Sequence, residues 1–335
     1  MDMYLPDIPG MSSRPFGDEN DYQAVADLVV AEARADGQDD AVVTAEDVET
    51  TYRNTEHMDL SRDFRFVEVD GAAVAYVTTR WWDEVEGLRI YRHMCKVAPQ
   101  WRGRGIGTAM LEWARGHLAE RAETHHTDRP RVYRTDVDQQ GADGAVLLEA
   151  AGYRAIQHSA GLVRPNLDDI PQAPLPDGAE VRPVTEDQLR AIYEADMEAS
   201  RDHWGFSEPT EKDWQAFLEF PYRDESLWKV AWYGNRVIGQ VRSFINEVEN
   251  RQNDRKRGWT EFISTARDWR GRGMATALIC ASMRELKARG MEQAALGVHV
   301  ENPHGAYRLY QGLGFEVDSF GTIYEKPFDP PTQAV

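Results

Sequence analysis

Apolar residues recur along the chain with two alternating periods, and these periods predict an ordered series of helices and strands. Residues 21–35 place Tyr22, Val25 and Leu28 at helical spacing, which indicates an amphipathic helix. Residues 65–77 alternate between apolar and polar side chains around an Asp70-Gly71 turn, which is typical of a β-hairpin. The same reasoning predicts a strand from residue 14, helices over residues 44–55, 106–121 and 141–151, and strands over residues 88–97 and 131–137.

The series then restarts in the second half of the chain. Prolines at close intervals in residues 164–178 forbid a helix and favour an extended linker. After it, the second half restarts at residues 180–184, and the pattern predicts helices through residue 199 and over 207–218, 274–289 and 302–313, a hairpin over 228–241, and strands at 258–266, 294–300 and 322–326. Strands and helices that alternate around hairpins indicate a mixed α/β fold. We therefore predict two tandem domains, residues 1–163 and 179–335, joined by the linker 164–178.

One sequence motif occurs in both halves, each time between a predicted strand and a predicted helix. Arg102-Gly103-Arg104-Gly105 stands in the first half and Arg270-Gly271-Arg272-Gly273 in the second, 168 positions later (273 − 105). Glycine permits a tight turn and a close approach to a ligand, and the first turn of a helix offers free N–H groups to an anion. The arginines add charged donors. Each loop is therefore a candidate phosphate site, and the duplication argues against a chance solvated turn.

These residues resemble the acyl-CoA signature of the GCN5-related N-acetyltransferases (GNAT). The resemblance rests on the two glycine loops and on a later tyrosine that precedes Gly314-Phe315, and it covers nearly the whole chain as a tandem pair. Together with Asp202-His203-Trp204-Gly205, the arrangement is similar to the mycothiol synthase-like tandem acetyltransferases of actinobacteria. It implies acetyl-CoA as co-substrate and no metal.

The resemblance also implies which residues hold the cofactor. In the second half these are Ile263, Ser264 and Thr265 at the strand end, the loop and helix start Arg270, Gly271, Arg272, Gly273, Met274, Ala275 and Thr276, and Asn302 and Tyr307 beyond them. In the first half they are Val97, Arg102, Gly103, Arg104, Gly105 and Gly107.

The two halves differ where catalysis is expected. The resemblance implies that Tyr310, four positions before Gly314, protonates the departing thiolate; a phenol hydroxyl is a suitable general acid. The first half has Leu148 four positions before Gly152, so we expect this half not to catalyse. On spacing alone, a core aromatic is the better explanation of Tyr310, and it is the loop upstream and Gly314-Phe315 downstream that favour a catalytic role.

An amine acceptor also needs a base, since amines are mostly charged at neutral pH. Glu261 lies on the strand that leads into the second loop and is our candidate, although related tandem enzymes carry their glutamate where Trp259 stands. Two positions along a strand share a face. The alternative is that Glu261 is an exposed glutamate of the strand without a catalytic role. Asp202 and Glu316 are then the other candidate bases.

Other polar residues are weaker candidates. His203 and Trp204 lie in the segment that forms a wall of the acceptor pocket in the family. A packing cluster at the end of a helix explains these two residues equally well. His125-His126 forms a doublet without a third ligand at useful spacing, so no metal site is expected. His299 alternates with valines on a strand and is expected to be structural.

Composition narrows the functional class. The chain has 335 residues, with 57 acidic and 38 basic side chains that give a net charge of −19, which argues against a nucleic-acid binder. No apolar run reaches the length of about 20 residues that a membrane span needs. The two cysteines form no disulfide framework, and no signal peptide is visible, which fits the cytoplasm.

We therefore expect an N-acetyltransferase that moves an acetyl group from acetyl-CoA to a small-molecule primary amine by direct attack in a ternary complex. Two alternatives remain: a non-catalytic acyl-CoA sensor, and a protein lysine or N-terminal acetyltransferase whose acidic surface recruits basic tails. We expect neither a nucleic-acid nor a membrane partner, and either a monomer or a homodimer. The sequence does not identify the acceptor.

Overall fold

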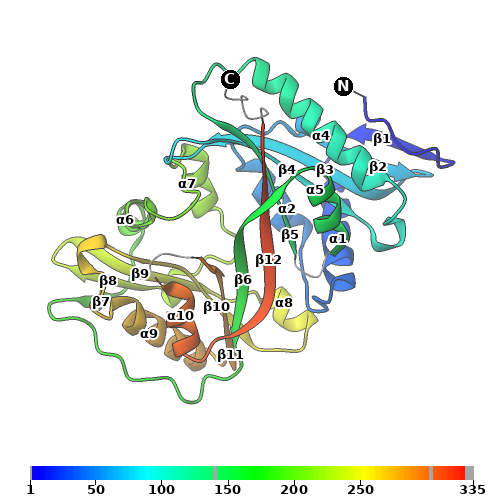
Figure 1. The fold of residues 1–335 in the computed structure, drawn as a ribbon. Helices are drawn as coiled ribbons and strands as arrows, with labels where there is room; N and C mark the ends of the chain where they lie inside the picture. Colours follow the sequence, from blue (N-terminus) through cyan, green and yellow to red (C-terminus); the bar gives the residue numbers. More distant parts are fainter. Residues whose placement is uncertain (1, 139–141, 302–304, 329–335) are drawn as a thin grey trace. The chain divides into compact units, whose positions relative to one another are not determined.

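The computed structural model describes residues 2–138, 142–301 and 305–328, which form two compact units (Figure 1). The first unit comprises Met1–Gln157, Thr210–Ala216 and Gly321–Val335, and the second comprises His158–Pro209 and Phe217–Phe320. Each unit therefore contains residues from both halves of the sequence.

The first unit is built on a mixed sheet. Its strand order is β1-β2-β3-β4-β5-β12, antiparallel except for the parallel pair β4 and β5. The strands are β1 (Met11–Pro15), β2 (Phe64–Val69), β3 (Ala72–Asp83), β4 (Arg89–Val97), β5 (Arg131–Asp138) and the end of β12 (Glu316–Pro327). The helices are α1 (Asn20–Ala35), α2 (Ala45–Arg53), α3 (Leu60–Asp63), α4 (Ile106–Glu123) and α5 (Ala142–Ala150).

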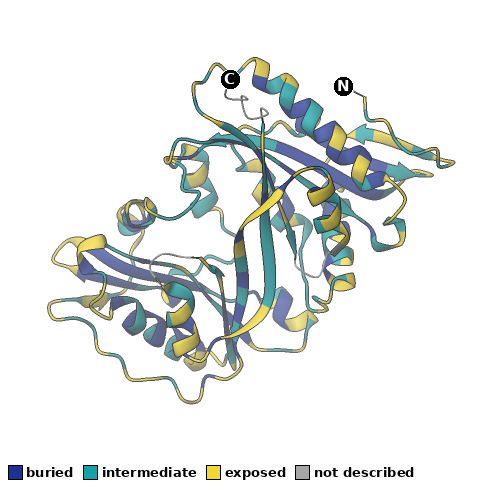
Figure 2. Cartoon of the chain, viewed as in Figure 1, coloured by how far each residue is buried: buried dark blue, intermediate teal, exposed yellow. Residues whose placement is uncertain are grey.

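Strand alternation divides the apolar residues of this sheet between two faces. Phe64 and Phe66 of β2 pack with α1 and α2, whereas Val67 of the same strand packs with α4. The buried side of α4 appears dark blue and its solvent side yellow in Figure 2. The Asp70-Gly71 turn joins β2 to β3 with positive φ at both residues (51° and 81°), as a tight hairpin requires. Thr44 and Asp47 form a reciprocal capping box that begins α2.

The second unit repeats this plan. Its strand order is β6-β11-β10-β9-β8-β7, with β10 and β11 as the parallel pair. The strands are β6 (Arg154–Arg164), β7 (Glu180–Arg182), β8 (Lys229–Tyr233), β9 (Arg236–Phe244), β10 (Arg257–Thr265) and β11 (Gln293–His299). The helices are α6 (Leu189–Ser200), α8 (Glu247–Gln252), α9 (Met274–Ala288) and α10 (Ala306–Gly312), whereas α7 (Glu211–Leu218) belongs to the first unit up to Ala216.

The last strand of each sequence half pairs with strands of the other half. β6 ends the first half and pairs antiparallel with β11, while Gly321–Pro327 of β12 pairs antiparallel with β5. For this reason the compact units differ from the predicted ranges 1–163 and 179–335. The proline-rich segment 164–178 has no helix and packs on the second core, where Leu167 is buried.

The structure confirms the predicted mixed α/β class and the duplicated order of elements. Sequence reasoning missed β6 and the short helix α8. In β6 the buried positions include Gln157 and Arg164, and Gly161 interrupts the run, so no apolar alternation is visible there. Among the described residues, no helix is long and apolar enough to cross a membrane.

We predict that Tyr324→Ala destabilises the first unit by about 3 kcal/mol, because a buried aromatic ring is removed from its core. Hydrogen exchange followed by mass spectrometry should show lost protection in β5, which β12 covers. Val317→Ala, on the exposed part of the same strand, is the control and should change stability by less than about 0.5 kcal/mol. Protection lost mainly in β10 would contradict the strand assignment.

Candidate active site

The parallel strands β10 and β11 of the second unit pair for only three residues and then part. Their register joins Arg257 to Gln293, Gly258 to Ala294 and Trp259 to Ala295. Immediately beyond, β10 is irregular against β9 between Glu261 and Ser264, and Phe262 adopts a left-handed φ of 50°. A bulge redirects the backbone and interrupts pairing. The register between β10 and β11 is therefore not continued beyond Trp259 and Ala295.

Glu261 lies at the point where the strands part. Its carboxylate accepts a hydrogen bond of 2.7 Å from the backbone N–H of Gly297 on β11. Burial raises the pKa of Glu261 to about 7, and the N–H groups of Gly297 and Phe262 limit that rise. A carboxyl group with a pKa near neutrality exchanges protons readily at physiological pH, which is the property of a general base.

Tyr310 on α10 faces the same region. Its side chain is buried and packs edge-on against Phe315. Burial raises the pKa of Tyr310 above its usual value, and the charge of Glu261 adds to the rise. The phenol therefore stays protonated across the physiological range and is available as a proton donor. The two predicted catalytic residues are therefore close enough for the charge of Glu261 to affect the pKa of Tyr310.

The glycine loop begins α9 without a side-chain cap. Gly271 and Gly273 have φ of 71° and 83°, and no atom lies within 4 Å of where a Cβ of Gly273 would be. The N–H groups of Met274, Ala275 and Thr276 begin the helix and no side chain caps them. Such a terminus favours an anion. The residues present therefore fit a phosphate-bearing cofactor.

The two loop arginines have different roles. Arg270 hydrogen-bonds the Ala199 carbonyl at 2.6 Å and forms an ion pair with Asp202, so it fastens the loop to the end of α6. Arg272 is exposed and lies over the Trp269 ring at 5.0 Å. Among the described residues, Arg272 forms no ion pair within 4 Å, whereas Arg270 forms one with Asp202. Asp202, which the sequence offered as another candidate base, forms this ion pair with Arg270.

The remaining predicted positions are spread around these groups. Ile263 and Thr265 are partly buried at the end of strand β10, and Ser264 between them is buried. Trp204 contacts His299 edge-on at 5.5 Å, and His203 is the residue before it. Tyr307, on α10, packs against the core, and Glu316 is exposed at the start of β12. Asn302 lies outside the described residues.

The first unit repeats the loop geometry in detail. Gly103 and Gly105 have φ of 71° and 84°, and Arg104 lies over the Trp101 ring at 4.7 Å. Arg102 is bidentate to Asp36 at 2.6 and 2.8 Å, which corresponds to Arg270 with Asp202. In contrast to Gly273, a Cβ at Gly105 would meet Pro6 at 3.3 Å, and one at Gly107 would meet Leu147 at 3.3 Å.

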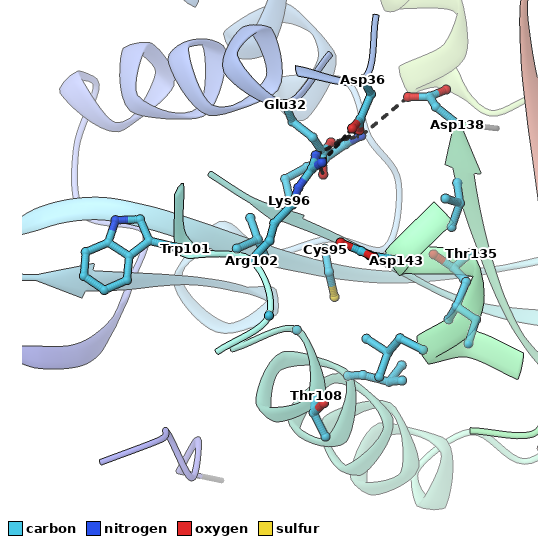
Figure 3. A pocket seen from close by; sticks show the side chains of 18 of the residues that line it. Glu32, Asp36, Cys95, Lys96, Trp101, Arg102, Thr108, Thr135, Asp138 and Asp143 are labelled. Atoms are coloured by element: carbon cyan, nitrogen blue, oxygen red, sulfur yellow. Dashed lines mark hydrogen bonds and ion pairs between the residues drawn. The ribbon is translucent and has the colours of Figure 1, made fainter. Parts of the chain in front are cut away.

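The first unit also holds a cavity of about 380 Å³ between the loop, β4 and β5 (Figure 3). Val97, Arg102 and Gly103 of the loop region line it. His93 and Leu148 occupy the positions that Glu261 and Tyr310 hold in the second unit. Sequence reasoning identified the substitution at 148 but missed His93, although the 168-residue offset between the loops points to it.

Histidines elsewhere have structural partners. The Tyr91 hydroxyl is 3.1 Å from Nδ1 of His125, and the His125 ring contacts Trp81. Among the residues that the structure describes, no three His, Cys, Asp or Glu side chains are grouped to hold a metal ion.

Two family models match the chain, one in each half of the sequence. The model described as the acetyltransferase (GNAT) family matches residues 189–315, and the model described as an acetyltransferase (GNAT) domain matches residues 61–155. Together the matched ranges cover more than half of the chain and confirm the predicted tandem arrangement.

Individual relatives agree with these models. A mycothiol acetyltransferase from Salinispora arenicola is 28% identical over 238 residues, covering 69% of this chain and 71% of the relative. A protein from Methanocaldococcus jannaschii described as an uncharacterized N-acetyltransferase is 34% identical over 140 residues, but the match spans 41% of this chain and 60% of that protein. The crystal structure of a GCN5-related N-acetyltransferase from Sphaerobacter thermophilus is similar over 99% of both chains, with a TM-score of 0.72 and 25% identity.

The raised pKa of Glu261 predicts a pH-dependent stability. Below the unfolded-state pKa of 4.5 both states are protonated; between 4.5 and about 7 the unfolded state releases the proton while the folded state keeps it. Stability therefore falls as pH rises through this window. Relative to Glu261→Gln, which does not titrate, the wild type should lose about 2 kcal/mol between pH 5 and pH 8.

Urea denaturation of both proteins at the two pH values measures this difference. Glu285→Gln is the control, because Lys229 lowers the pKa of Glu285 and that carboxylate does not titrate above pH 5. The wild type and Glu285→Gln should lose the same free energy of unfolding between pH 5 and pH 8. If the wild type and Glu261→Gln also lose the same amount, the raised pKa of Glu261 is contradicted.

Proposed function

Because the chain belongs to the GNAT acetyltransferase family and is an acetyl-CoA-dependent N-acetyltransferase, we propose that its second unit transfers the acetyl group to a primary amine of a small molecule by direct attack. The observation that carries this proposal is Glu261, held at the parting of β10 and β11 and electrostatically coupled to Tyr310. A relative named as a mycothiol acetyltransferase supports a small-molecule acceptor over a protein substrate.

Glu261 and Tyr310 would each transfer one proton in the acetyl transfer. Acetyl-CoA supplies the thioester, whose carbonyl carbon the acceptor nitrogen attacks while the carbon–sulfur bond breaks. Glu261 takes the proton that the amine nitrogen loses, and the Tyr310 hydroxyl gives its proton to the departing sulfur. The two proton transfers balance, so the products are an amide and the free thiol, with Glu261 protonated and Tyr310 ionised until they exchange with water.

Binding of the cofactor rests on the backbone. The uncapped N–H groups that begin α9 and the exposed Arg272 would hold the phosphates, and the open space at Gly273 admits them closely. Ile263 to Thr265 would bind the pantetheine through backbone groups beyond the bulge, and such donors can also polarise the thioester carbonyl. His203 and Trp204 would wall the acceptor side.

We predict that Tyr310→Phe lowers kcat by about 10²–10⁴-fold, because the departing sulfur loses its proton donor. Calorimetric titration should show acetyl-CoA binding changed by less than about twofold, since the hydroxyl contacts only the reacting end of the cofactor. Tyr193→Phe, a buried tyrosine on α6, is the control for loss of a phenol hydroxyl. Unchanged turnover in Tyr310→Phe would remove the phenol from the mechanism, and a wild type that binds acetyl-CoA but acetylates no amine would favour a sensor.

We further predict that kcat/KM rises with pH through an apparent pKa near 7, because only ionised Glu261 accepts a proton. Glu261→Gln should remove this inflection and lower the plateau by about 10²-fold or more. The measurement is the pH–rate profile between pH 5.5 and 9 with a fixed alkylamine acceptor, with kcat/KM expressed per concentration of neutral amine, because the amine itself also titrates. An inflection near 7 that persists in Glu261→Gln would assign the base to another group.

A further inference from the structure

Five aromatic side chains of the second unit lie outside its apolar core. They are Phe220 and Tyr222, which follow α7, Phe244 at the end of β9, and Trp259 and Phe262 on β10. None of the five belongs to the cluster of buried residues that forms the core of this unit, and none is among the partly buried residues that pack against it. Apolar surface that lies outside a core and is still open to solvent commonly marks a binding site.

The five rings form one contiguous surface. Phe220 meets Phe244, Tyr222 and Phe262 edge to face, with ring centroids 5.0, 5.7 and 5.9 Å apart. Tyr222 and Trp259 each stack on Phe244, with centroids 5.9 Å apart in both pairs. We call this set the aromatic surface.

The aromatic surface lies on the face of the sheet that carries Glu261. Trp259 is opposite Phe244 in the register of β10 and β9, and Glu261 is two positions further along β10. Residues two apart on a strand point to the same face. The aromatic surface therefore begins beside the carboxylate to which the proposed function assigns the acceptor amine.

Phe262 is the most exposed of the five rings. It is 44% exposed, whereas the other four are partly buried. Its backbone has a left-handed φ of 50° and lies within the irregularity between Glu261 and Ser264. A left-handed backbone is unfavourable for a bulky residue, and leaving a phenyl ring in water adds to the cost. Strain of this kind is found at functional sites, and a bulge beside such a site re-aims a side chain.

The first unit has no counterpart of this exposed ring. The 168-residue offset between the glycine loops places Met94 at the position of Phe262. Around Met94 the register of β4 with β3 continues without a shift, from Asp83 opposite Arg89 to Ala75 opposite Val97. The shared fold therefore requires neither the bulge nor an aromatic residue at this position.

A cation already occupies the Phe262 ring. The guanidinium carbon of Arg242 lies over this ring, 4.4 Å from its centroid, and Arg242 is buried and paired with Asp196. The attraction of the ring for a cation is thus satisfied within the protein. A neutral aromatic group can still pack against Phe262 edge-on or offset, whereas an ammonium group would be repelled by Arg242.

The positions of the two groups also limit the length of the ligand. Glu261 and Phe262 are consecutive, and consecutive Cα atoms are about 3.8 Å apart. One small molecule can therefore contact both side chains if only a few bonds separate its amine from its apolar group.

We propose that the acceptor is an arylalkylamine, whose nitrogen meets Glu261 and whose neutral aromatic ring packs on Phe262 and Phe220. This inference rests on the proposed function and names the acceptor class of the same site. Phe262 is then a residue that determines specificity, because it contacts the part of the acceptor that does not react.

The test compares three acceptors with the full chain at saturating acetyl-CoA. They are 2-phenylethylamine, 2-cyclohexylethylamine of nearly the same size, and 1,5-diaminopentane, which has a second amine in place of the ring. With kcat/KM expressed per concentration of neutral amine, 2-phenylethylamine should exceed 2-cyclohexylethylamine about threefold or more, because paired aromatic rings gain energy beyond that of area burial. It should exceed 1,5-diaminopentane about tenfold or more, because the diamine buries less apolar area and brings a second charge.

Variants of Phe262 show whether this ring sets the preference. Phe262→Leu keeps an apolar side chain without the aromatic ring, so the ratio of kcat/KM for the phenyl and cyclohexyl amines should fall to about one. Phe262→Tyr retains a ring and should keep the wild-type ratio. Tyr233→Leu removes an exposed ring elsewhere in the second unit and should leave the ratio unchanged. Because each ratio is measured within one protein, a general loss of activity or of folded protein cancels.

Calorimetric titration of 2-phenylethylamine measures binding without turnover, and Phe262→Leu should weaken this binding about threefold or more. Equal turnover of the two ring-bearing amines, a preference for 1,5-diaminopentane, or a preference that persists in Phe262→Leu would overturn this inference and leave the proposed function intact. If the wild type acetylates none of the three amines, the proposed function fails and the titration decides. Binding weakened in Phe262→Leu and kept in Phe262→Tyr would then support the aromatic site, and equal or absent binding would overturn it.

Discussion

The chemistry of this molecule depends on the early separation of one parallel strand pair. β10 and β11 share three register positions, and a bulge with a left-handed phenylalanine then turns β10 away from its partner. Backbone polar groups that lose a neighbouring strand must be satisfied otherwise. The Glu261 carboxylate accepts a hydrogen bond from the N–H of Gly297 on β11, and burial raises the pKa of this carboxyl group to about 7.

A guanidinium contact fixes the glycine loop next to that opening. Arg270 joins the loop to Asp202 and to the carbonyl of Ala199, and Arg102 joins the first loop to Asp36. Because the same contact occurs in both units, it belongs to the scaffold and holds each loop against the end of the first long helix of its unit, α1 or α6. The second arginine of each loop lies on a tryptophan ring and keeps its charge toward solvent.

Much of this was accessible from the sequence, and the failures have physical causes. Periodicity located the hairpins and the helices that follow the loops, because one face of each is apolar. The duplicated glycine phrase located both loops, since only glycine suits their backbone. Periodicity could not reveal which strand pairs with which, so the pairing of β6 with β11 was missed. Nor could it show that Arg102 and Arg270 are engaged by Asp36 and Asp202, because these contacts join residues 66 and 68 positions apart.

The pairing of β12 with β5 also orders events during synthesis. β5 is translated early, but the residues that cover it, Gly321–Pro327, leave the ribosome only after the whole second half. Until then β5 presents an open edge, which is a template for association with other chains. A nascent chain that pauses in the second half therefore carries an unfinished first sheet, which is completed only after β12 has been translated.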